Sequence, residues 1–208
     1  MDQKTEAKRI TSLSDPGLAD AVRARDPYAL EMVVRAYLPQ ILRAAIGTGL
    51  NETDAEDVTQ ETFVTFIAKA DTFEGRSHVR TWIFGILYRK ILQSYRQDKK
   101  QQQMDDIDEV VEQRFRKDGQ WARPPEAIDT VLHHADIRSA IEDCLEGVPT
   151  RQRMVFVLRE IEHQTTSEIC KILEVTATNV GALLSRARNR LRECLESKGM
   201  SGSNDASL

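Results

Sequence analysis

Four carboxylates are crowded into the stretch DAEDVTQETFVTF, residues 54–66, and no basic side chain lies among them. They are Asp54, Glu56, Asp57 and Glu61. Helical positions three and four apart are neighbours, so Asp54, Asp57 and Glu61 would form one acidic stripe. Such a stripe has three possible uses: it binds a metal ion, it faces solvent, or it docks on a basic surface of another protein.

A metal site is the least supported of these three uses. Helical di-metal proteins need a Glu-x-x-His pair on each of two helices. This chain has one match, Glu160 with His163, far from the acidic stripe. We therefore expect no metal and no cofactor. A solvated face remains an alternative, although the apolar neighbours Phe63, Phe66 and Ile67 favour docking on a protein.

A second group of residues, 73–96, interleaves aromatic and basic side chains. Single-stranded nucleic acids require both, because bases stack on aromatic faces and phosphates pair with cations. A loop with Gly75, Ser77 and His78 can form a pocket for an unstacked base. The alternative is that the aromatic residues belong to a core, which is favoured for Trp82. The other aromatic residues are Phe73, Phe84, Tyr88 and Tyr95, and the basic ones are Arg76, Arg80, Arg89, Lys90 and Arg96.

A third group predicts a helix-turn-helix, because TTSEICKILEV and TATNVGALLSRARNRLRECLE read as two helices joined by a short turn. Thr165 with Glu168 forms a capping box for the first helix, and Thr176 caps the second. In this motif the second helix enters the DNA major groove while basic residues hold phosphates. An ordinary helix with a solvated arginine face is the alternative. The candidate contacts are Thr176, Thr178, Asn179 and Ser185, with Arg186, Arg188, Arg190 and Arg192.

Helical periodicity runs through nearly the whole 208-residue chain. Asp26 with Pro27 marks one helix start, and Thr53 with Glu56 forms a capping box for the next helix. We predict an all-α fold of two small helical domains joined by an acidic linker, the C-terminal domain being the helix-turn-helix. The expected boundaries are 16–98 for the first domain, 99–125 for the linker, 126–196 for the second domain and 197–208 for a disordered tail.

The net charge of −4 conceals two basic segments. Residues 71–100 hold seven basic and three acidic side chains, and residues 151–194 hold eight basic and five acidic. Between them, residues 101–146 hold five basic and twelve acidic. A phosphate backbone responds to charge within a Debye length, so the local excess is compatible with binding nucleic acid.

The cysteines and the apolar segments limit the cellular context. Cys144, Cys170 and Cys194 are an odd number at wide spacing, without a CxxC pair, so we expect buried free thiols. The sequence shows neither a signal peptide nor an apolar stretch long enough to span a bilayer. We therefore expect a cytoplasmic location.

The chain contains three segments in the following order: DAEDVTQETFVTF, then TFEGRSHVRTWIFGILYRK, then VPTRQRMVFVLREIEHQTTSEICKILEVTATNVGALLSRARNRLRECL. Together they resemble the extracytoplasmic-function sigma factors of bacterial RNA polymerase, over about residues 20–195. The resemblance implies a non-enzymatic alternative sigma factor that binds RNA polymerase core and directs promoter-specific initiation. Its implied partners are the largest polymerase subunits, duplex promoter DNA, the melted non-template strand and an anti-sigma factor, with no insertion into the membrane.

The resemblance also assigns individual residues to three binding surfaces. Polymerase binding falls to Asp54, Asp57, Gln60 and Glu61. Recognition of the −10 promoter element falls to Phe73, Glu74, Gly75, Arg76, Ser77, His78, Arg80, Arg89, Lys90, Gln93 and Arg96. Recognition of the −35 element falls to Thr166, Thr176, Thr178, Asn179, Ala182, Ser185, Arg186 and Arg188.

One alternative function is kept, a helix-turn-helix regulator that binds duplex DNA without polymerase. Such a regulator would usually bind as a dimer to a palindromic site. It would leave the aromatic and basic side chains of residues 73–96 without a role. A third class, a helical metalloenzyme, lacks its ligand set.

Overall fold

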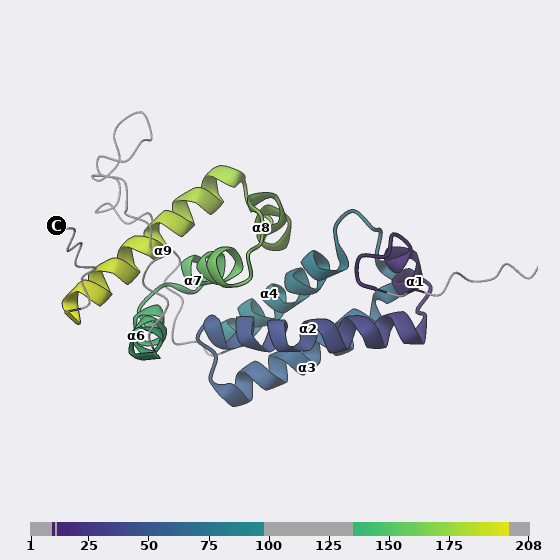
Figure 1. The fold of residues 1–208 in the computed structure, drawn as a ribbon, viewed down its shortest axis with the longest axis horizontal. Coiled ribbons are helices and arrows are strands. Elements are labelled where there is room, and N and C mark those ends of the chain that lie inside the picture. Colours follow the sequence, from purple (N-terminus) through teal and green to yellow (C-terminus); the bar gives the residue numbers. More distant parts are fainter. Residues whose placement is uncertain (1–9, 11, 98–134, 200–208) are drawn as a thin grey trace, which may run out of the picture. The chain divides into compact units, whose positions relative to one another are not determined.

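The protein is described by a computed structural model, which covers residues 10, 12–97 and 135–199 (Figure 1). All regular structure in these ranges is helical, which confirms the predicted all-α class. The described residues form two compact units, one mainly from the chain up to α4 and one mainly from α6 onward. The predicted linker, 99–125, and all but the first residues of the predicted tail lie outside the described residues.

The N-terminal unit contains four α-helices and one 3-10 turn. They are α1 (Leu18–Arg23), α2 (Pro27–Gly47), α3 (Glu52–Ala68), the 3-10 turn (Ala70–Thr72) and α4 (Val79–Gln97). The predicted start of α2 is confirmed, because the Ala29 amide donates to Asp26 Oδ1 at 2.8 Å and Pro27 is the first helical residue. None of the described helices is long and apolar enough to cross a bilayer.

The start of α3 differs from the prediction. Asn51, rather than Thr53, is the N-cap, because its side chain accepts a hydrogen bond from the Asp54 amide at 2.8 Å. Its amide nitrogen also donates to the Asp54 carboxylate at 2.7 Å. The helix therefore begins at Glu52, and Glu52 and Asp54 lie in its first turn, where the helix dipole favours negative charge.

Aromatic rings fill the core beneath α3 and α4. Phe66 is fully buried and meets Phe63 and Trp82 edge-on, with ring centroids 6.5 and 5.7 Å apart. Phe73 then stacks on Trp82 at 4.8 Å. Because offset and edge-on aromatic pairs add to the free energy of burial, this row of rings fixes α3, the loop after it and α4 as one body.

The C-terminal unit holds the predicted helix-turn-helix. Its elements are α6 (Ala135–Glu146), α7 (Thr150–Phe156), a π-helical turn (Val157–Ile161), α8 (Thr166–Leu173) and α9 (Ala177–Ser197). The capping box at α8 is confirmed, since the Thr165 amide donates to Glu168 Oε2 at 2.8 Å and the Glu168 amide donates to Thr165 Oγ1 at 3.2 Å. Thr176 caps α9 by accepting from the Asn179 amide at 3.3 Å.

A buried arginine closes the end of α6. The guanidinium of Arg153 donates to the main-chain carbonyls of Glu146 and Val148 at 2.7 and 2.9 Å. The last carbonyls of a helix lack partners inside the helix, so a cation at this end satisfies them and opposes the helix dipole. Arg153 therefore holds the turn from α6 into α7.

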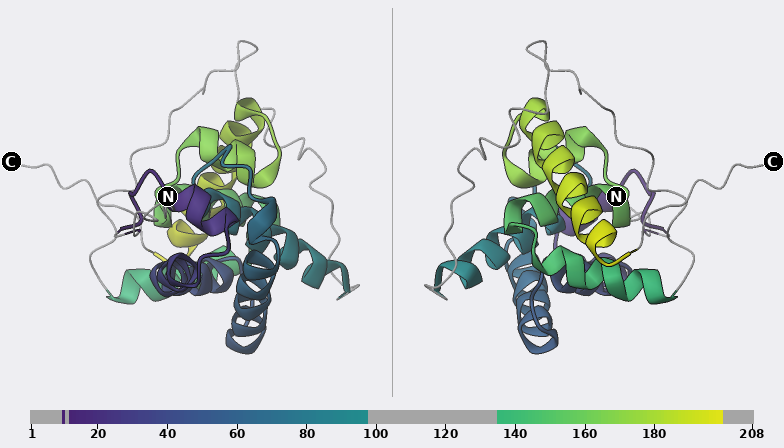
Figure 2. Two further views of the ribbon diagram at one scale, coloured as in Figure 1. Left: turned by 90° about the vertical axis from the view of Figure 1, so that its right-hand side faces the viewer. Right: turned by 90° about the vertical axis from the view of Figure 1, so that its left-hand side faces the viewer.

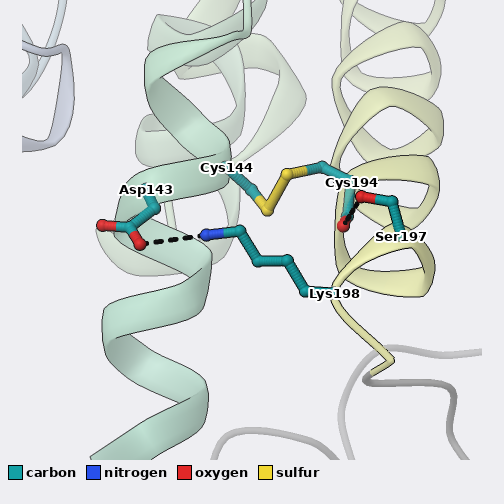
Figure 3. Close-up of a disulfide and its surroundings, with 5 residues drawn as sticks. All are labelled: Asp143, Cys144, Cys194, Ser197 and Lys198. Atoms are coloured by element: carbon teal, nitrogen blue, oxygen red, sulfur yellow. Dashed lines mark hydrogen bonds and ion pairs between the residues drawn. A yellow bond between two sulfur atoms is a disulfide. The ribbon is translucent and has the colours of Figure 1, made fainter.

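The C-terminal end of α9 lies across α6, as the right-hand view of Figure 2 shows. Their contact is a buried apolar cluster that also includes Phe156 of α7. A disulfide between Cys144 and Cys194 crosses this contact, with 5.7 Å between the Cα atoms (Figure 3). Beside it, Lys198 pairs with Asp143 at 2.9 Å. The bond covalently joins the first and last helices of the unit.

The expectation of three buried free thiols is therefore wrong. Cys144 and Cys194 are bonded, and Cys170, the free thiol, is only half-buried. The sequence carries no local sign of the bond, because its two cysteines are 50 residues apart. Only the packing of α9 on α6 brings them together.

We expect reduction of this disulfide to destabilise the C-terminal unit by about 2–4 kcal/mol, because the bond restricts the unfolded chain over a long loop. The measurement is hydrogen exchange of α6 and α9 peptides in urea, with and without dithiothreitol. Cys194→Ala should reproduce the effect of the reductant. Cys170→Ala is the matched control and should respond to the reductant as wild type does. Equal exchange in the fully reduced and oxidised proteins would contradict the prediction.

Candidate functional site

The acidic stripe lies on the outside of α3. Asp57, Gln60 and Glu61 are exposed and Asp54 is half-buried, while Val58 on the same helix is buried. The stripe therefore lies on the outer face of the helix, as predicted from helical spacing.

The apolar side chains expected beside the stripe are only partly available for docking. Phe63 and Phe66 are buried in the core, so the expectation that they contribute to a docking face is wrong. Ile67 is exposed, and so is Val64, at 68%, which the sequence analysis did not single out. Val64 and Ile67 follow Glu61 at steps of three residues, so they lie close to the carboxylates on the surface of α3.

A groove of about 180 Å³ separates the acidic stripe from α4. It is lined by Asp54, Asp57, Val58 and Glu61 of α3 and by Lys90, Gln93 and Ser94 of α4. Across it, Lys90 Nζ lies 2.9 Å from Glu61 Oε2. Residues that were predicted to serve two different partners, polymerase and DNA, thus face one groove. Sequence reasoning missed this because the paired residues are 29 positions apart.

The loop between the 3-10 turn and α4 is exposed at its tip and anchored at its start. Glu74, Gly75, Arg76 and His78 are exposed, and Ser77 is half-buried. Arg76 pairs with Glu74 within the loop. Gly75 has φ +71°, a backbone conformation that side chains with a Cβ rarely adopt.

Phe73 was predicted to contact DNA, and its position does not fit that role. Its ring is 3% exposed and stacks on Trp82, so the structure does not present it to a base. Its role is to anchor the loop that follows. The exposed loop positions after it keep their predicted role as candidates for binding a base.

Arg80 also differs from its predicted role as a DNA contact. It is half-buried, its Nε donates to Gln40 Oε1 at 2.9 Å, and its guanidinium lies 5.2 Å from the centre of the Phe84 ring. Burial raises the pKa of the nearby Tyr37 hydroxyl, and the positive charge of Arg80 acts in the opposite direction. Arg80 therefore joins α4 to α2.

The remaining predicted −10 contacts lie along α4. Arg89 and Gln93 are four residues apart and so share one face of the helix, whereas the side chain of Arg96 lies outside the described part of the chain. Arg89 and Gln93 are exposed, whereas Lys90 is half-buried beside Glu61. On this face Arg89 is an exposed cation.

The start of α9 presents the polar side chains expected of a recognition helix. Thr176, Thr178 and Asn179 are exposed there, and Thr166 is exposed at the start of α8. Ala182 and Arg186, further along α9, are half-buried. The exposed groups surround the amino-terminal end of α9, the end that enters the major groove in helix-turn-helix proteins.

Two other residues of α9 do not match their predicted role as −35 contacts. The Ser185 hydroxyl is buried and has no hydrogen-bond partner among the described residues. Arg188 pairs with Glu160, from the π-helical turn. The Ser185 hydroxyl therefore belongs to the packing of the unit, and the Arg188 side chain is held by this ion pair.

Comparison with known proteins identifies the family. Residues 33–101 match the family Sigma-70 region 2, and residues 138–191 match Sigma-70, region 4. A Haemophilus influenzae protein named "Probable RNA polymerase sigma factor" is 30% identical over 158 residues, which cover 72% of this chain and 81% of that relative. The chain belongs to the extracytoplasmic-function sigma factors of the sigma-70 family.

Two further likenesses extend over most of this sigma factor. RNA polymerase sigma factor YlaC of Bacillus subtilis is 25% identical, with coverage of 79% of this chain and 91% of the relative. The fold also matches the sigma factor RpoE of Bartonella quintana, solved in complex with the anti-sigma factor NepR. That match has a TM-score of 0.60 and 24% identity, and covers 80% of this chain and 96% of that one.

The two family matches cover different parts of the sigma factor. Region 2 spans most of α2, all of α3 and α4, and therefore contains the acidic stripe, the groove and the exposed loop. Region 4 extends from α6 into α9 and contains the helix-turn-helix. A helix-turn-helix regulator that works without polymerase does not account for the region 2 match.

We expect Phe73→Ala to destabilise the N-terminal unit by about 3–5 kcal/mol, because the substitution leaves a cavity against Trp82 in the core. Urea unfolding followed by circular dichroism measures the change. Glu74→Ala, at the next position and exposed, should change stability by less than about 0.5 kcal/mol. A Phe73→Ala protein of wild-type stability that loses only DNA binding would restore the base-contact role.

Proposed function

We propose that this sigma factor binds RNA polymerase core through the acidic stripe of α3. The observation that carries the proposal is the exposure of Asp57, Gln60 and Glu61 on one side of a helix whose opposite side is the core. Val64 and Ile67 extend this surface with apolar area. An acidic patch with an apolar border matches a basic surface on the largest polymerase subunit, since complementary charge steers and orients docking.

The same proposal assigns the promoter DNA to the two units. The exposed loop residues 74–78 and the Arg89 face of α4 bind the −10 element and its melted non-template strand. The start of α9 binds the −35 element as duplex. Strand separation must offset base-pair stacking of about 1.4 kcal/mol per step. Stacking of captured bases on the protein recovers about 1–3 kcal/mol each, and the rest comes from phosphate contacts and from the polymerase.

The proposal also covers the organisation and setting of the protein. Residues 16–98 act as the polymerase-docking and −10 domain, residues 126–196 as the −35 domain, and residues 99–125 as the linker between them. The protein acts in the cytoplasm without a cofactor and makes or breaks no covalent bond. The likeness to RpoE, which was solved in complex with the anti-sigma factor NepR, supports an anti-sigma factor as the regulatory partner of this chain.

Asp57→Lys tests the docking surface. We expect it to weaken binding to purified core by about tenfold or more, because it places like charges face to face. Fluorescence anisotropy of labelled protein with core measures binding, and run-off transcription from genomic fragments measures initiation. Glu31→Lys, with the same charge change at an exposed site on α2, should bind like wild type.

Two outcomes would contradict the docking proposal. Equal losses for Asp57→Lys and Glu31→Lys would show that only net charge matters. A wild-type protein that ignores core but binds duplex DNA alone would support the helix-turn-helix regulator instead.

Asn179→Ala and Ser185→Ala test the −35 surface as a matched pair. Loss of a side chain that contacts a base costs about 1–3 kcal/mol, so Asn179→Ala should reduce initiation at a −35-dependent promoter by roughly tenfold or more. Ser185→Ala should leave initiation close to wild type, because its hydroxyl is already buried. Run-off transcription with saturating core compares them. The reverse order of effects would show that a different face of α9 meets the DNA.

A further inference from the structure

The ion pair between Glu61 and Lys90 joins the two binding surfaces of the N-terminal unit. Glu61 belongs to the proposed polymerase surface and Lys90 to the proposed DNA surface, and their charged atoms are 2.9 Å apart. The two side chains are unequally accessible, at 62% exposed for Glu61 and 26% for Lys90. A partner can therefore reach Glu61 while Lys90 is still held against the groove.

The surroundings of the pair are acidic. Three carboxylates, those of Asp54, Asp57 and Glu61, line the groove from α3. From α4 the lining is one ammonium, Lys90, with uncharged Gln93 and Ser94. A phosphate approaching this part of α4 meets an excess of negative charge, and the one cation in the groove lining is already paired with Glu61. The groove therefore disfavours DNA as long as the carboxylates are uncompensated.

We propose that the Glu61–Lys90 ion pair couples polymerase docking to DNA binding within this chain. In the free protein, Glu61 holds Lys90 and the groove remains acidic. When a basic protein surface binds the stripe, it neutralises the carboxylates and takes over Glu61, and Lys90 becomes available to a phosphate. The inference rests on the proposed function, because the polymerase group that replaces Lys90 as the partner of Glu61 binds the same docking surface.

The size of this coupling follows from the nature of the pair. Partly exposed ion pairs in proteins are weak, so releasing Lys90 should change an affinity by about two- to fivefold, most clearly at low salt. Coupling between two ligands is reciprocal. A substitution that frees Lys90 should therefore strengthen DNA binding, and one that frees Glu61 should strengthen binding to core.

The first experiment uses the free full-length protein and a labelled 20-nucleotide single strand of mixed sequence, titrated by anisotropy at several salt concentrations. Glu61→Gln should bind about two- to fivefold more tightly than wild type. The plot of its log binding constant against log salt concentration should also be steeper by about one, which is the change in slope for one added phosphate contact. Glu56→Gln removes the same charge from an exposed site of α3 outside the groove lining, and should change little.

A double-mutant cycle separates the ion pair from general repulsion. In the Lys90→Gln background, Glu61→Gln should lose most of its gain, because no lysine remains to be released. If the gain persists in that background, or if Glu56→Gln gains as much as Glu61→Gln, repulsion alone explains the data and the coupling is overturned.

The second experiment needs no DNA. Lys90→Gln frees Glu61 and should bind core about two- to fivefold more tightly than wild type. Lys69→Gln, which removes an exposed lysine at the C-cap of α3, is the matched control and should stay near wild type. Equal gains for the two variants would overturn the coupling while leaving docking intact. A wild-type protein that does not bind core would overturn the proposed function, and the exchange step with it.

Discussion

The packing of α3 against α4 is the constraint on which the N-terminal unit depends. Phe66 is fully buried and meets Trp82, and Trp82 in turn stacks on Phe73 at the start of the exposed loop. Because one face of α3 is committed to this core, its carboxylates must lie on the other face. The buried Thr62 hydroxyl donates to the Val58 carbonyl at 2.7 Å, so the packed face carries no unsatisfied hydroxyl at this position. Surfaces for two macromolecular partners thus follow from one packed interface.

A chain of net charge −4 can bind DNA because its charges are segregated. The exposed carboxylates of α3 include Asp57 and Glu61, while Arg89 is an exposed cation of α4. Screening limits each group to its neighbourhood, so a cationic face remains attractive to phosphate even in an acidic protein. Where the acidic and the basic faces meet, the local electrostatic potential depends on which charges are paired. A change in a single ion pair therefore alters it.

The parts of this structure that sequence reasoning predicted are those controlled by local chemistry. The capping residues Asp26, Thr165 and Thr176 act within four positions of themselves, so they are visible in the chain. At α3 two local signals competed, Asn51 before Asp54 and Thr53 before Glu56. The structure has Asn51 as the N-cap, in line with the greater preference of asparagine over threonine for this position.

What the sequence did not reveal depends on packing between distant segments. Neither the disulfide nor the Glu61–Lys90 pair has a spacing rule, because each is formed by two helices that meet in the fold. The same holds for the roles of Arg80 and Arg188. The sequence does not distinguish a basic side chain that faces solvent from one that is bound within the fold. Arg80 is bound to Gln40 and Arg188 to Glu160.

The disulfide also affects how mechanical load passes through the C-terminal unit. Cys144 precedes α7 and Cys194 is near the end of α9, so α7, α8 and α9 up to Cys194 lie inside one covalent ring. Tension applied to the chain on the two sides of this ring is transmitted through the sulfur–sulfur bond and bypasses α7, α8 and most of α9. The oxidised protein can therefore be pulled from both sides without stretching the recognition helix. In the reduced protein, the form that cytosolic thiols favour, the same force acts on that helix directly.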